Sequence, residues 1–565
     1  MIEYCEEDFN IKALGSFYHQ ESTLFRVFAP DYKTMDVCVD GAVYPMLRRG
    51  FCFELRLLGD LILSRYYYIG DKKTRFADPF AYLSRDGKSY VLDSRRFISE
   101  TITQAKVKAP VIYECSVHDF SFDETYPGKY KGKFLAFTES GLKGKNGKSI
   151  GLDYLRELGI SHVQLMPVFD FNYDKSHYNW GYNPQAYNYV KDDYVFDKEN
   201  PYAYVNELRM AVNACHKAGI RVVLDVVFNH VYRYKEFDLG KMLKGRCYRY
   251  KENGKLAEGT FCGNEIKSED PFVRAYIVEM VERYLKLFDI DGIRMDLMGI
   301  SDIKTVNEIF ETLRQEKEDF MVYGEGWNMG DVLPEWRRAS INNADQMDHV
   351  AMFNDYFRDT MIHYVSGNTL IDEDVCRCLR ADPNYLSEEH SINYVECHDD
   401  YTFYDRMLIY KSEDEKAINR RRARLAMGLV MIAKGIPFIH SGEEFLRSKN
   451  GTKNSYNSGD LINRFNWDRR ELMDDTVRYL KELIAIRQKY DCFCDEQAFI
   501  GFESYYGALI YRIDNLTIFI NPGSEDILYD DGFERRIIFA DERIRDSRGT
   551  LVDVSPYSIV ICENE

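Results

Sequence analysis

The alternation of apolar and polar residues divides the chain into three parts. Up to about residue 105, short apolar runs alternate strictly with polar positions, as in Phe51, Phe53 and Leu55. This pattern is typical of strands that bury one face, and a succession of them predicts a β-sandwich. Short β-type runs return after residue 490, so we expect a small C-terminal antiparallel β-domain.

Between these ends, eight apolar runs alternate with helical patterns. Strand followed by helix, repeated eight times, predicts an α/β fold with a (β/α)8 TIM barrel, with excess length in loops, notably 230–269. The eight runs are residues 111–113, 162–168, 221–227, 292–295, 320–323, 350–353, 392–395 and 437–440. The expected domains are an N-terminal β-sandwich at 1–105, the catalytic barrel at 106–490 and a C-terminal β-domain at 491–565.

Two barrel helices can be bounded from the sequence. Asp270 is a good N-cap before Pro271 at the first helical position, and apolar residues then repeat at helical spacing. A second helix is expected from about Tyr204 to Ala218, with Gly219 as its stop. This helix leads directly into the third predicted strand, which is the repeat unit of a barrel.

Composition narrows the class of partner and compartment. Lys and Arg number 74 against 92 Asp and Glu, and the formal charge of −18 disfavours nucleic acid and anionic membranes. The first residues are acidic and no stretch is apolar enough to span a bilayer, so we expect a cytoplasmic protein. We also expect a monomer. Thirteen scattered cysteines predict free thiols rather than a disulfide framework or a zinc site.

Aromatic residues are abundant, at 15% of the chain. Such side chains serve either large cores or surfaces that stack on ligands with apolar and polar edges, and composition alone favours the core. The predicted barrel holds every tryptophan, which leaves open whether the N-terminal module binds a ligand. The four tryptophans are Trp180, Trp327, Trp336 and Trp467.

Polar side chains follow several of the predicted barrel strands. Catalytic groups of such barrels cluster at the carboxyl ends of the strands, so we expect these side chains to meet. They are Asp225 and His230 after the third run, Arg294 and Asp296 on one face of the fourth, Glu325 after the fifth, and His398 and Asp399 after the seventh.

This set of groups suits glycoside hydrolysis. In that reaction two carboxyl groups flank the scissile bond, one as nucleophile or base and the other as proton donor. Arg294 would keep Asp296 ionised, whereas Glu325 as a proton donor would need a pKa raised by burial and by neighbouring negative charge. His230 and His398 are suitable hydrogen-bond donors to sugar hydroxyls.

Four segments, in order, resemble the signature regions of the α-amylase superfamily of glycoside hydrolases. They are Asp225-Val226-Val227-Phe228-Asn229-His230, Gly292-Ile293-Arg294-Met295-Asp296, Glu325 after Tyr323-Gly324, and Val395-Glu396-Cys397-His398-Asp399. Within the superfamily, Tyr178-Asn179-Trp180-Gly181-Tyr182-Asn183-Pro184 resembles the segment that marks type I pullulanases. The N-terminal module is similar to the starch-binding-like sandwich that precedes many debranching enzymes.

The resemblance implies hydrolysis of α-1,6-glucosidic linkages in pullulan, amylopectin, glycogen or limit dextrins by a retaining double displacement. It implies Asp296 as the nucleophile, Glu325 as the general acid/base and Asp399 as the carboxylate that stabilises the transition state. The partner is therefore an α-glucan. The further residues implied to bind it are Tyr178, Trp180, Tyr182, Asp225, His230, Arg294, Trp327, His398, Asp460 and Arg464, the last two at the −2 sugar.

Two positions depart from the family pattern, and one bears on metal binding. Asn183 stands where the family segment usually has Asp. Asp400 replaces a usual Asn, and a second carboxylate there is expected to raise the pKa of Asp399 by like-charge repulsion. The chemistry requires no metal or cofactor. Asn229 matches a residue that binds calcium in many amylases, so a structural calcium ion stays an open alternative. The sequence shows no evident set of oxygen ligands around it.

Other interpretations remain at this point. The same machinery could act on α-1,4 bonds, as in an amylase or a neopullulanase-like enzyme, or on glycogen, as in an isoamylase-type debrancher. A glucan-binding protein without activity and a barrel enzyme of another class are further alternatives. In the loop after the third strand, Tyr248-Arg249-Tyr250 is a candidate for glucan contact or for core packing.

Overall fold

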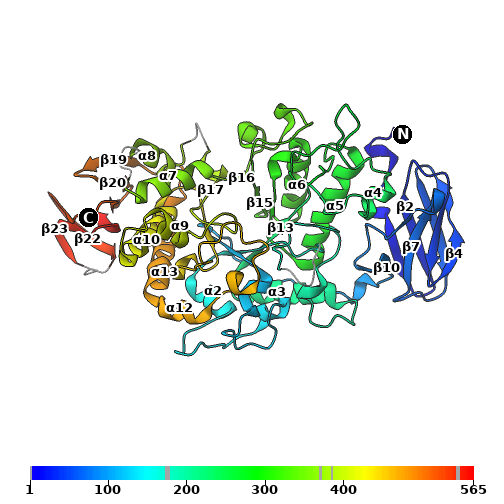
Figure 1. Cartoon of the computed structure of the whole chain (residues 1–565), viewed down its shortest axis with the longest axis horizontal. Coiled ribbons are helices and arrows are strands. Elements are labelled where there is room, and N and C mark those ends of the chain that lie inside the picture. Colours follow the sequence, from blue (N-terminus) through cyan, green and yellow to red (C-terminus); the bar gives the residue numbers. More distant parts are fainter. Residues whose placement is uncertain (1–2, 172–177, 368–371, 383–385, 542–546, 565) are drawn as a thin grey trace.

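A closed parallel barrel lies between two antiparallel β-modules, and this confirms the predicted fold class. In Figure 1 the N-terminal module (blue) and the C-terminal sheet (red) stand at opposite ends of the molecule. The computed structural model describes the chain except for residues 1–2, 172–177, 368–371, 383–385, 542–546 and 565.

The N-terminal module consists of two antiparallel sheets, ordered β1-β2-β6-β5 and β4-β3-β7-β10-β9, with β8 paired to β7. Alternate side chains enter the core, as Tyr66 and Tyr68 do on β7. The strands are β1 (Gly15–His19), β2 (Ser22–Phe28), β3 (Met35–Val39), β4 (Ala42–Pro45), β5 (Leu47–Arg49), β6 (Cys52–Leu58), β7 (Arg65–Gly70), β8 (Arg75–Phe76), β9 (Ser84–Arg85) and β10 (Lys88–Tyr90).

Eight strands close the barrel in chain order, and each overlaps one of the predicted runs. Apolar side chains such as Ile112, Val223 and Phe438 fill the interior, and Tyr323 Oη donates to Gln164 Oε1 at 2.6 Å across it. The strands are β11 (Ile112–Cys115), β12 (His162–Leu165), β13 (Arg221–Val226), β14 (Gly292–Met295), β15 (Met321–Gly324), β16 (Val350–Phe353), β17 (Ser391–Asn393) and β18 (Ile436–His440).

The helices bear out both sequence-based boundaries. The carboxylate of Asp270 caps α5 by accepting from two backbone amides, and Gly219 follows α3 with a φ of +78°. The helices are α1 (Val117–Phe122), α2 (Leu152–Leu158), α3 (Ala203–Lys217), α4 (Asp238–Met242), α5 (Pro271–Phe288), α6 (Ile303–Glu316), α7 (Asp355–Val365), α8 (Asp372–Leu379), α9 (Phe403–Tyr410), α10 (Lys416–Ile432), α11 (Asp460–Asn463), α12 (Trp467–Leu472) and α13 (Asp474–Lys489).

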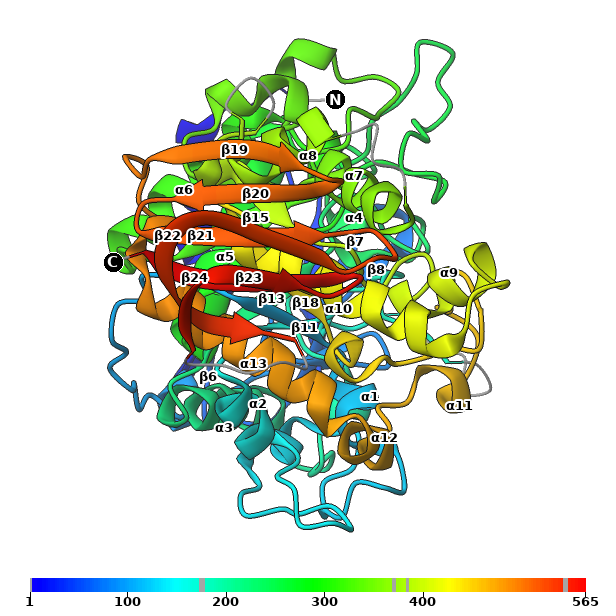
Figure 2. The ribbon, with the colours of Figure 1, turned by 90° about the vertical axis from the view of Figure 1, so that its left-hand side faces the viewer.

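The C-terminal module is one antiparallel sheet of order β19-β20-β21-β24-β22-β23, seen face-on in Figure 2. The rings of Tyr479 on α13 and Phe539 on β22 meet edge-on at 5.3 Å and join this sheet to the barrel helices. The strands are β19 (Ile500–Tyr505), β20 (Ala508–Ile513), β21 (Leu516–Asn521), β22 (Ile527–Ala540), β23 (Arg548–Val554) and β24 (Ser558–Asn564).

The N-terminal module packs against α5 and the loop before it. Phe28 stacks on Phe272 with ring centroids 4.3 Å apart, and Tyr276 Oη donates to the carbonyl of Pro79 at 3.1 Å. Tyr32 Oη donates to the carbonyl of Lys241 on α4 at 2.8 Å. The barrel and this module are therefore joined by aromatic packing. Within the described residues, no helix has the length and apolar character needed to cross a bilayer.

The cap of α5 gives a stability prediction. Asp270 Oδ1 accepts from the amides of Phe272 and Val273 at 3.1 and 3.4 Å and from Tyr4 Oη at 2.8 Å. Asp270→Ala leaves these donors without that acceptor, so we expect a loss of about 1–2 kcal/mol and a lower thermal unfolding midpoint by circular dichroism. Asp270→Asn, which keeps an acceptor oxygen, should recover most of the loss. An Ala variant that unfolds at the wild-type temperature would contradict this account.

Candidate active site

The predicted carboxylates meet around the guanidinium of Arg294, which is buried on β14. Nη1 lies 3.0 Å from Asp225 Oδ1 and 3.0 Å from Asp296 Oδ1, and Nη2 lies 2.5 Å from Glu325 Oε1. Asp225 stands directly opposite Arg294 in the β13–β14 register, and Glu325 follows β15. One fork thus binds acidic groups from three adjacent strands at their carboxyl ends.

Both carboxylate oxygens of Asp296 accept hydrogen bonds. Oδ1 faces Arg294, and Oδ2 accepts from Nδ2 of Asn229 at 2.8 Å. The same Asn229 amide donates to the Asp296 carbonyl at 2.7 Å, which fixes the backbone beside the side chain. These donors fix the position of the Asp296 carboxyl group at the cleft wall.

A tight turn after β14 joins Asp296 to the loop that carries Glu325. Gly299 donates its amide to the Glu325 carbonyl at 2.9 Å. A Cβ at Gly299 would lie 1.9 Å from the carbonyl oxygen of Trp327, so only glycine allows this approach of the two backbones. The spacing between the two carboxylates therefore depends on a backbone contact as well as on Arg294.

Glu325 has the properties of a proton donor. Its side chain is buried, and Oε2 accepts from the amide of Leu297 at 2.9 Å. Burial, with added repulsion from Asp296 and Asp399, raises the pKa of Glu325 to about 8 despite the opposing charge of Arg294. Glu325 therefore holds a proton at neutral pH, as its expected role requires.

Asp399 shows the opposite behaviour. Loss of solvent in the cleft acts to raise the pKa of Asp399. His398 outweighs this effect, since its Nε2 lies 3.3 Å from Asp399 Oδ2, and the pKa of Asp399 falls to about 2. The expectation that Asp400 raises this pKa is wrong. Asp400 pairs with Arg406 at 3.1 Å and Lys453 at 3.5 Å, so its charge is balanced by cations that the local sequence does not reveal.

Glu114, which no sequence pattern indicated, binds His398. Glu114 lies on β11 and is buried; its oxygens accept from the amide of His398 at 2.8 Å and face its Nδ1 at 2.7 Å. Burial would lower the pKa of His398, but Asp399 and Glu114 together raise it well above the ordinary value. The predicted first strand ended at Tyr113, one residue before Glu114.

Aromatic side chains form one wall of the site. The ring of Tyr182 stacks on His398 at 4.7 Å, and its hydroxyl donates to Asp225 Oδ2 at 2.6 Å. Trp180 meets His398 edge-on at 5.1 Å. Burial raises the pKa of Asp225 to about 7, with Arg294 and the Tyr182 hydroxyl acting against that rise.

Two adjoining hollows open at this point, of about 300 and 330 Å³. They share Glu325, Trp327, His398 and Asp399. The first is also lined by Trp180, Tyr182, His230, Asp296 and Tyr456, and the second by Arg294, Phe353 and Tyr394. The nucleophile candidate and the proton-donor candidate therefore face the same cleft, with aromatic rings beside them.

Four of the predicted binding residues do not line these two hollows: Asp225, which lies behind them on Arg294 and Tyr182, and Tyr178, Asp460 and Arg464. Tyr178 Oη donates to Asp119 at 2.7 Å, Asp460 contacts His118 at 2.9 Å, and Arg464 contacts Asp123 at 2.9 Å. Tyr178 and His118 line a neighbouring hollow of about 250 Å³. Asn179 lines both this hollow and the cleft, so the two are adjacent.

Tyr248-Arg249-Tyr250, in the loop after β13, was a candidate for glucan contact or for core packing. Tyr248 and Arg249 are buried, and Arg249 is bound by Glu265, Glu269 and the carbonyl of Ile300. Tyr250 is exposed but lines neither of the two hollows of the cleft. Buried packing thus accounts for Tyr248 and Arg249.

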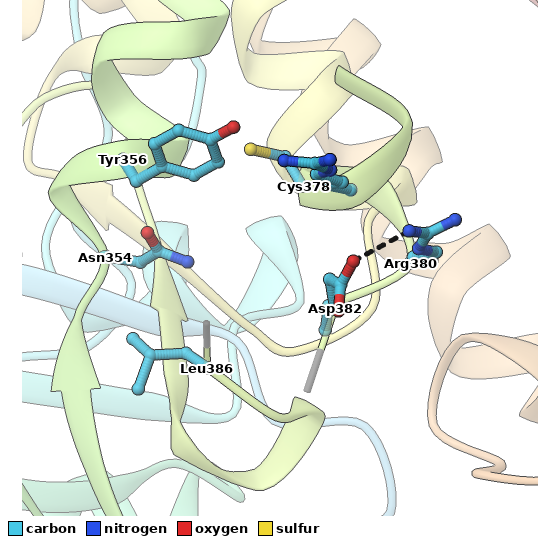
Figure 3. Close-up of a pocket in the computed structure, with 8 residues that line it drawn as sticks. Asn354, Tyr356, Cys378, Arg380, Asp382 and Leu386 are labelled. Carbon is cyan, nitrogen blue, oxygen red and sulfur yellow. Dashed lines mark hydrogen bonds and ion pairs between the residues drawn. The ribbon is translucent and has the colours of Figure 1, made fainter. Parts of the chain in front are cut away.

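A further hollow of about 440 Å³ lies beside α7 and α8 and holds none of the predicted site residues (Figure 3). Its Arg380 and Asp382 pair with each other at 2.7 Å, as the dashed line shows. Among the described residues that line this hollow, Asp382 is the one carboxyl group, whereas the cleft has several.

Asn229 does not fit a calcium ligand in this arrangement. Its Nδ2 donates to Asp296, and its Oδ1 lies 2.5 Å from Nδ1 of His230, so its side-chain polar atoms already have partners. Among the described residues, no group of three or more His, Cys, Asp or Glu side chains could hold a metal ion. The thirteen cysteines are all unpaired.

Comparisons with known proteins identify relatives that are glycoside hydrolases. The α-amylase catalytic-domain model matches residues 133–251. The chain is 34% identical to the pullulanase of Bacillus subtilis strain 168, over 85% of this chain and 72% of that protein. A pullulanase structure from Paenibacillus barengoltzii, in complex with maltohexaose and α-cyclodextrin, matches with a TM-score of 0.92 and 32% identity, over 99% of this chain and 96% of that one.

A pullulanase from Anoxybacillus sp. LM18-11, complexed with maltotetraose, has a TM-score of 0.94 and 29% identity, over 99% of this chain and 89% of that one. The similarity therefore extends through both β-modules as well as the barrel. The chain belongs to the pullulanase family of debranching glycoside hydrolases, within the α-amylase family.

Proposed function

We propose that this enzyme hydrolyses α-1,6-glucosidic branch linkages of α-glucans with retention of configuration, with Asp296 as nucleophile and Glu325 as general acid/base. The observation that carries the proposal is the Arg294 fork, which places the carboxyl group of Asp296 and the protonated carboxyl group of Glu325 on one cleft. The bound maltotriose and maltotetraose of the Anoxybacillus pullulanase structures support an oligosaccharide substrate.

In the first step, Glu325 gives its proton to the glycosidic oxygen while Asp296 attacks the anomeric carbon. The bond between that carbon and the oxygen breaks, the leaving sugar departs with a free hydroxyl, and a glycosyl ester forms on Asp296. Arg294 and Asn229 keep the carboxylate of Asp296 aligned for attack. Asp399 stays ionised because of its low pKa and stabilises positive charge on the sugar ring.

In the second step, Glu325 acts as a base. It takes a proton from water, the water oxygen attacks the anomeric carbon, and the ester bond to Asp296 breaks. The released sugar carries the same anomeric configuration as the substrate, and both carboxyl groups return to their starting protonation. Loss of the proton from Glu325 in the first step prepares the base that the second step needs.

We assign the cleft aromatics and polar groups to the sugar next to the broken bond. Tyr182 offers a flat face to this sugar, and Trp180 and Trp327 flank that face. His230 and His398 donate to the sugar hydroxyls. Asp225 and Arg294 hold these side chains in place through their contacts with Tyr182 and with each other. Tyr178, Asp460 and Arg464 would reach the −2 sugar only through the adjoining hollow at His118, since each is bound to a neighbour outside the cleft.

The proposed units are residues 1–105, 106–490 and 491–565, in agreement with gaps between β10 and β11 and between α13 and β19. We propose a monomer in the cytoplasm, where a reducing environment suits thirteen free thiols. The polymer substrates would be amylopectin, glycogen or their limit dextrins, in carbohydrate metabolism, with no cofactor required.

Product analysis on pullulan tests the bond specificity. Cleavage of α-1,6 bonds should release maltotriose, whereas panose or isopanose would contradict the proposal and favour a neopullulanase-like enzyme.

Asp296→Asn, which keeps the shape of the side chain, should lower kcat by at least about 10⁴-fold. An Asn variant with near wild-type turnover would show that the nucleophile is another residue.

The pH profile tests the role of Glu325. The proton donor must be protonated in the free enzyme, so kcat/KM should fall about tenfold per pH unit above the Glu325 pKa of about 8. Asp399 should not limit activity until pH approaches about 2. An alkaline fall near pH 4–5, which is ordinary for glutamate, or a flat profile up to pH 10, would contradict the assignment.

Glu114 is a positioning residue that acts through His398. Glu114→Gln removes the carboxylate beside the imidazole, so the pKa of His398 should fall and a decline of kcat/KM set by His398 should enter the pH profile below the one set by Glu325. We expect kcat/KM to fall about 10- to 100-fold, the size of a lost charge-assisted hydrogen bond. Glu114→Asp, which keeps the charge, should retain the wild-type pH profile. A Gln variant with an unshifted profile would exclude this role.

A further inference from the structure

The loop after β15 carries a second tryptophan outside the cleft. Trp336, in the short helix η8 (Glu335–Arg337), is 70% exposed, whereas Trp180 and Trp467 are buried and Trp327 is half-buried. The guanidinium of Arg337 lies 6.0 Å from the centroid of the Trp336 ring, and most of the indole still faces water. Trp336 therefore needs an explanation of its own.

A groove of about 670 Å³ runs beside Trp336 along helix α6. Trp336 and Arg337 form one side, and Asn307, Glu311 and Gln346 contribute to the others. These side chains supply both hydrogen-bond donors and acceptors next to a flat apolar ring. A ligand with an apolar face and a rim of hydroxyl groups, such as a glucose unit, matches this combination.

The loop is held rigidly behind the indole. Glu335 Oε1 accepts from Asn328 Nδ2 at 2.8 Å and from Asn342 Nδ2 at 2.9 Å, and the Glu335 carbonyl accepts from Asn343 at 2.8 Å. Arg338 Nε donates to the carbonyl of Leu333 at 2.8 Å. Hydrogen bonds thus hold the backbone on both sides of the exposed ring, which reduces the entropy lost when a ligand orders this loop.

The loop that carries Trp336 also reaches the catalytic cleft. Asn328, which donates to Glu335, follows Trp327 in the sequence, and Trp327 lines the cleft. The carboxylates that line the groove, Glu6, Asp302, Glu308 and Glu311, disfavour a polyanion. A lining made mainly of charged and polar side chains also differs from the apolar core of a protein interface. The enzyme's own neutral polymer is the occupant that fits both the chemistry and the position.

We propose that Trp336 and this groove form a second binding site, outside the cleft, for a linear α-1,4-glucan segment of the polymer substrate. The glucan class of the ligand rests on the proposed function. The site holds an outer chain of the branched polymer while a branch point occupies the cleft. It lowers the KM for polymers and has no part in bond cleavage.

Trp336→Ala tests the site in the full-length enzyme. We expect the KM on amylopectin to rise about tenfold, in keeping with the loss of one stacking contact, while kcat on amylopectin and all parameters on a short singly branched oligosaccharide stay unchanged. Trp336→Tyr, which keeps a flat ring, should restore most of the polymer affinity. An equal loss on polymer and short substrate, or no change on either, would overturn the proposal.

Binding can be measured without turnover in a Glu325→Gln background. Calorimetric titration with maltoheptaose should give two sites in this background and one after Trp336→Ala is added. The same stoichiometry in both proteins would overturn the second site. If pullulan gave panose while Trp336→Ala still removed one maltoheptaose site, the proposed bond specificity would fail and the second site would stand.

Discussion

The active site depends on a single buried cation. The guanidinium of Arg294 is 1% exposed and has carboxylates of Asp225, Asp296 and Glu325 within 3.0 Å. A buried charge is tolerated only when paired, and removal of one partner from such a group typically costs about 3–5 kcal/mol. Since the acidic partners come from β13, β14 and the end of β15, only the closed barrel brings them to one guanidinium.

Neighbouring carboxyl groups of the cleft differ in charge because their surroundings differ. Glu325 is buried beside two other acids, so its pKa rises to about 8, whereas Asp399 has a cationic neighbour in His398 and its pKa falls to about 2. His398 in turn keeps its charge because Asp399 and, from β11, Glu114 both raise its pKa. A chain of contacts from β11 to the cleft thus separates a proton donor from an ionised stabiliser.

The sequence predicts the barrel well because its information is local. Each strand is a short apolar run, and the N-cap of α5 is read from Asp270 and Pro271 alone. The catalytic candidates are also local, since they follow strand ends. Glu114 was not predicted because it lies in an otherwise apolar strand, one residue past the predicted end of that strand. The prediction for Asp400 was wrong because its partners Arg406 and Lys453 lie in other segments.

Contacts between distant segments account for the other differences between sequence and structure. Tyr178, Asp460 and Arg464 are bound by side chains of α1 and the residues after it, which no local pattern places beside them. The exposure of Trp336 is likewise a property of the folded surface, and its residue type alone gave no indication of it. Polar pairing across the fold is therefore what sequence reasoning lacked.

Trapping the glycosyl–enzyme ester tests the central claim most directly. In maltotriosyl fluoride the leaving group is fluoride, which departs without a proton donor. In Glu325→Gln the first step should therefore proceed, while the second step, which needs Glu325 as a base, should be slow. Mass spectrometry of the digested protein should then find the sugar on the peptide that contains Asp296. An adduct on any other carboxylate, or none while the inverted product accumulates, would contradict the account.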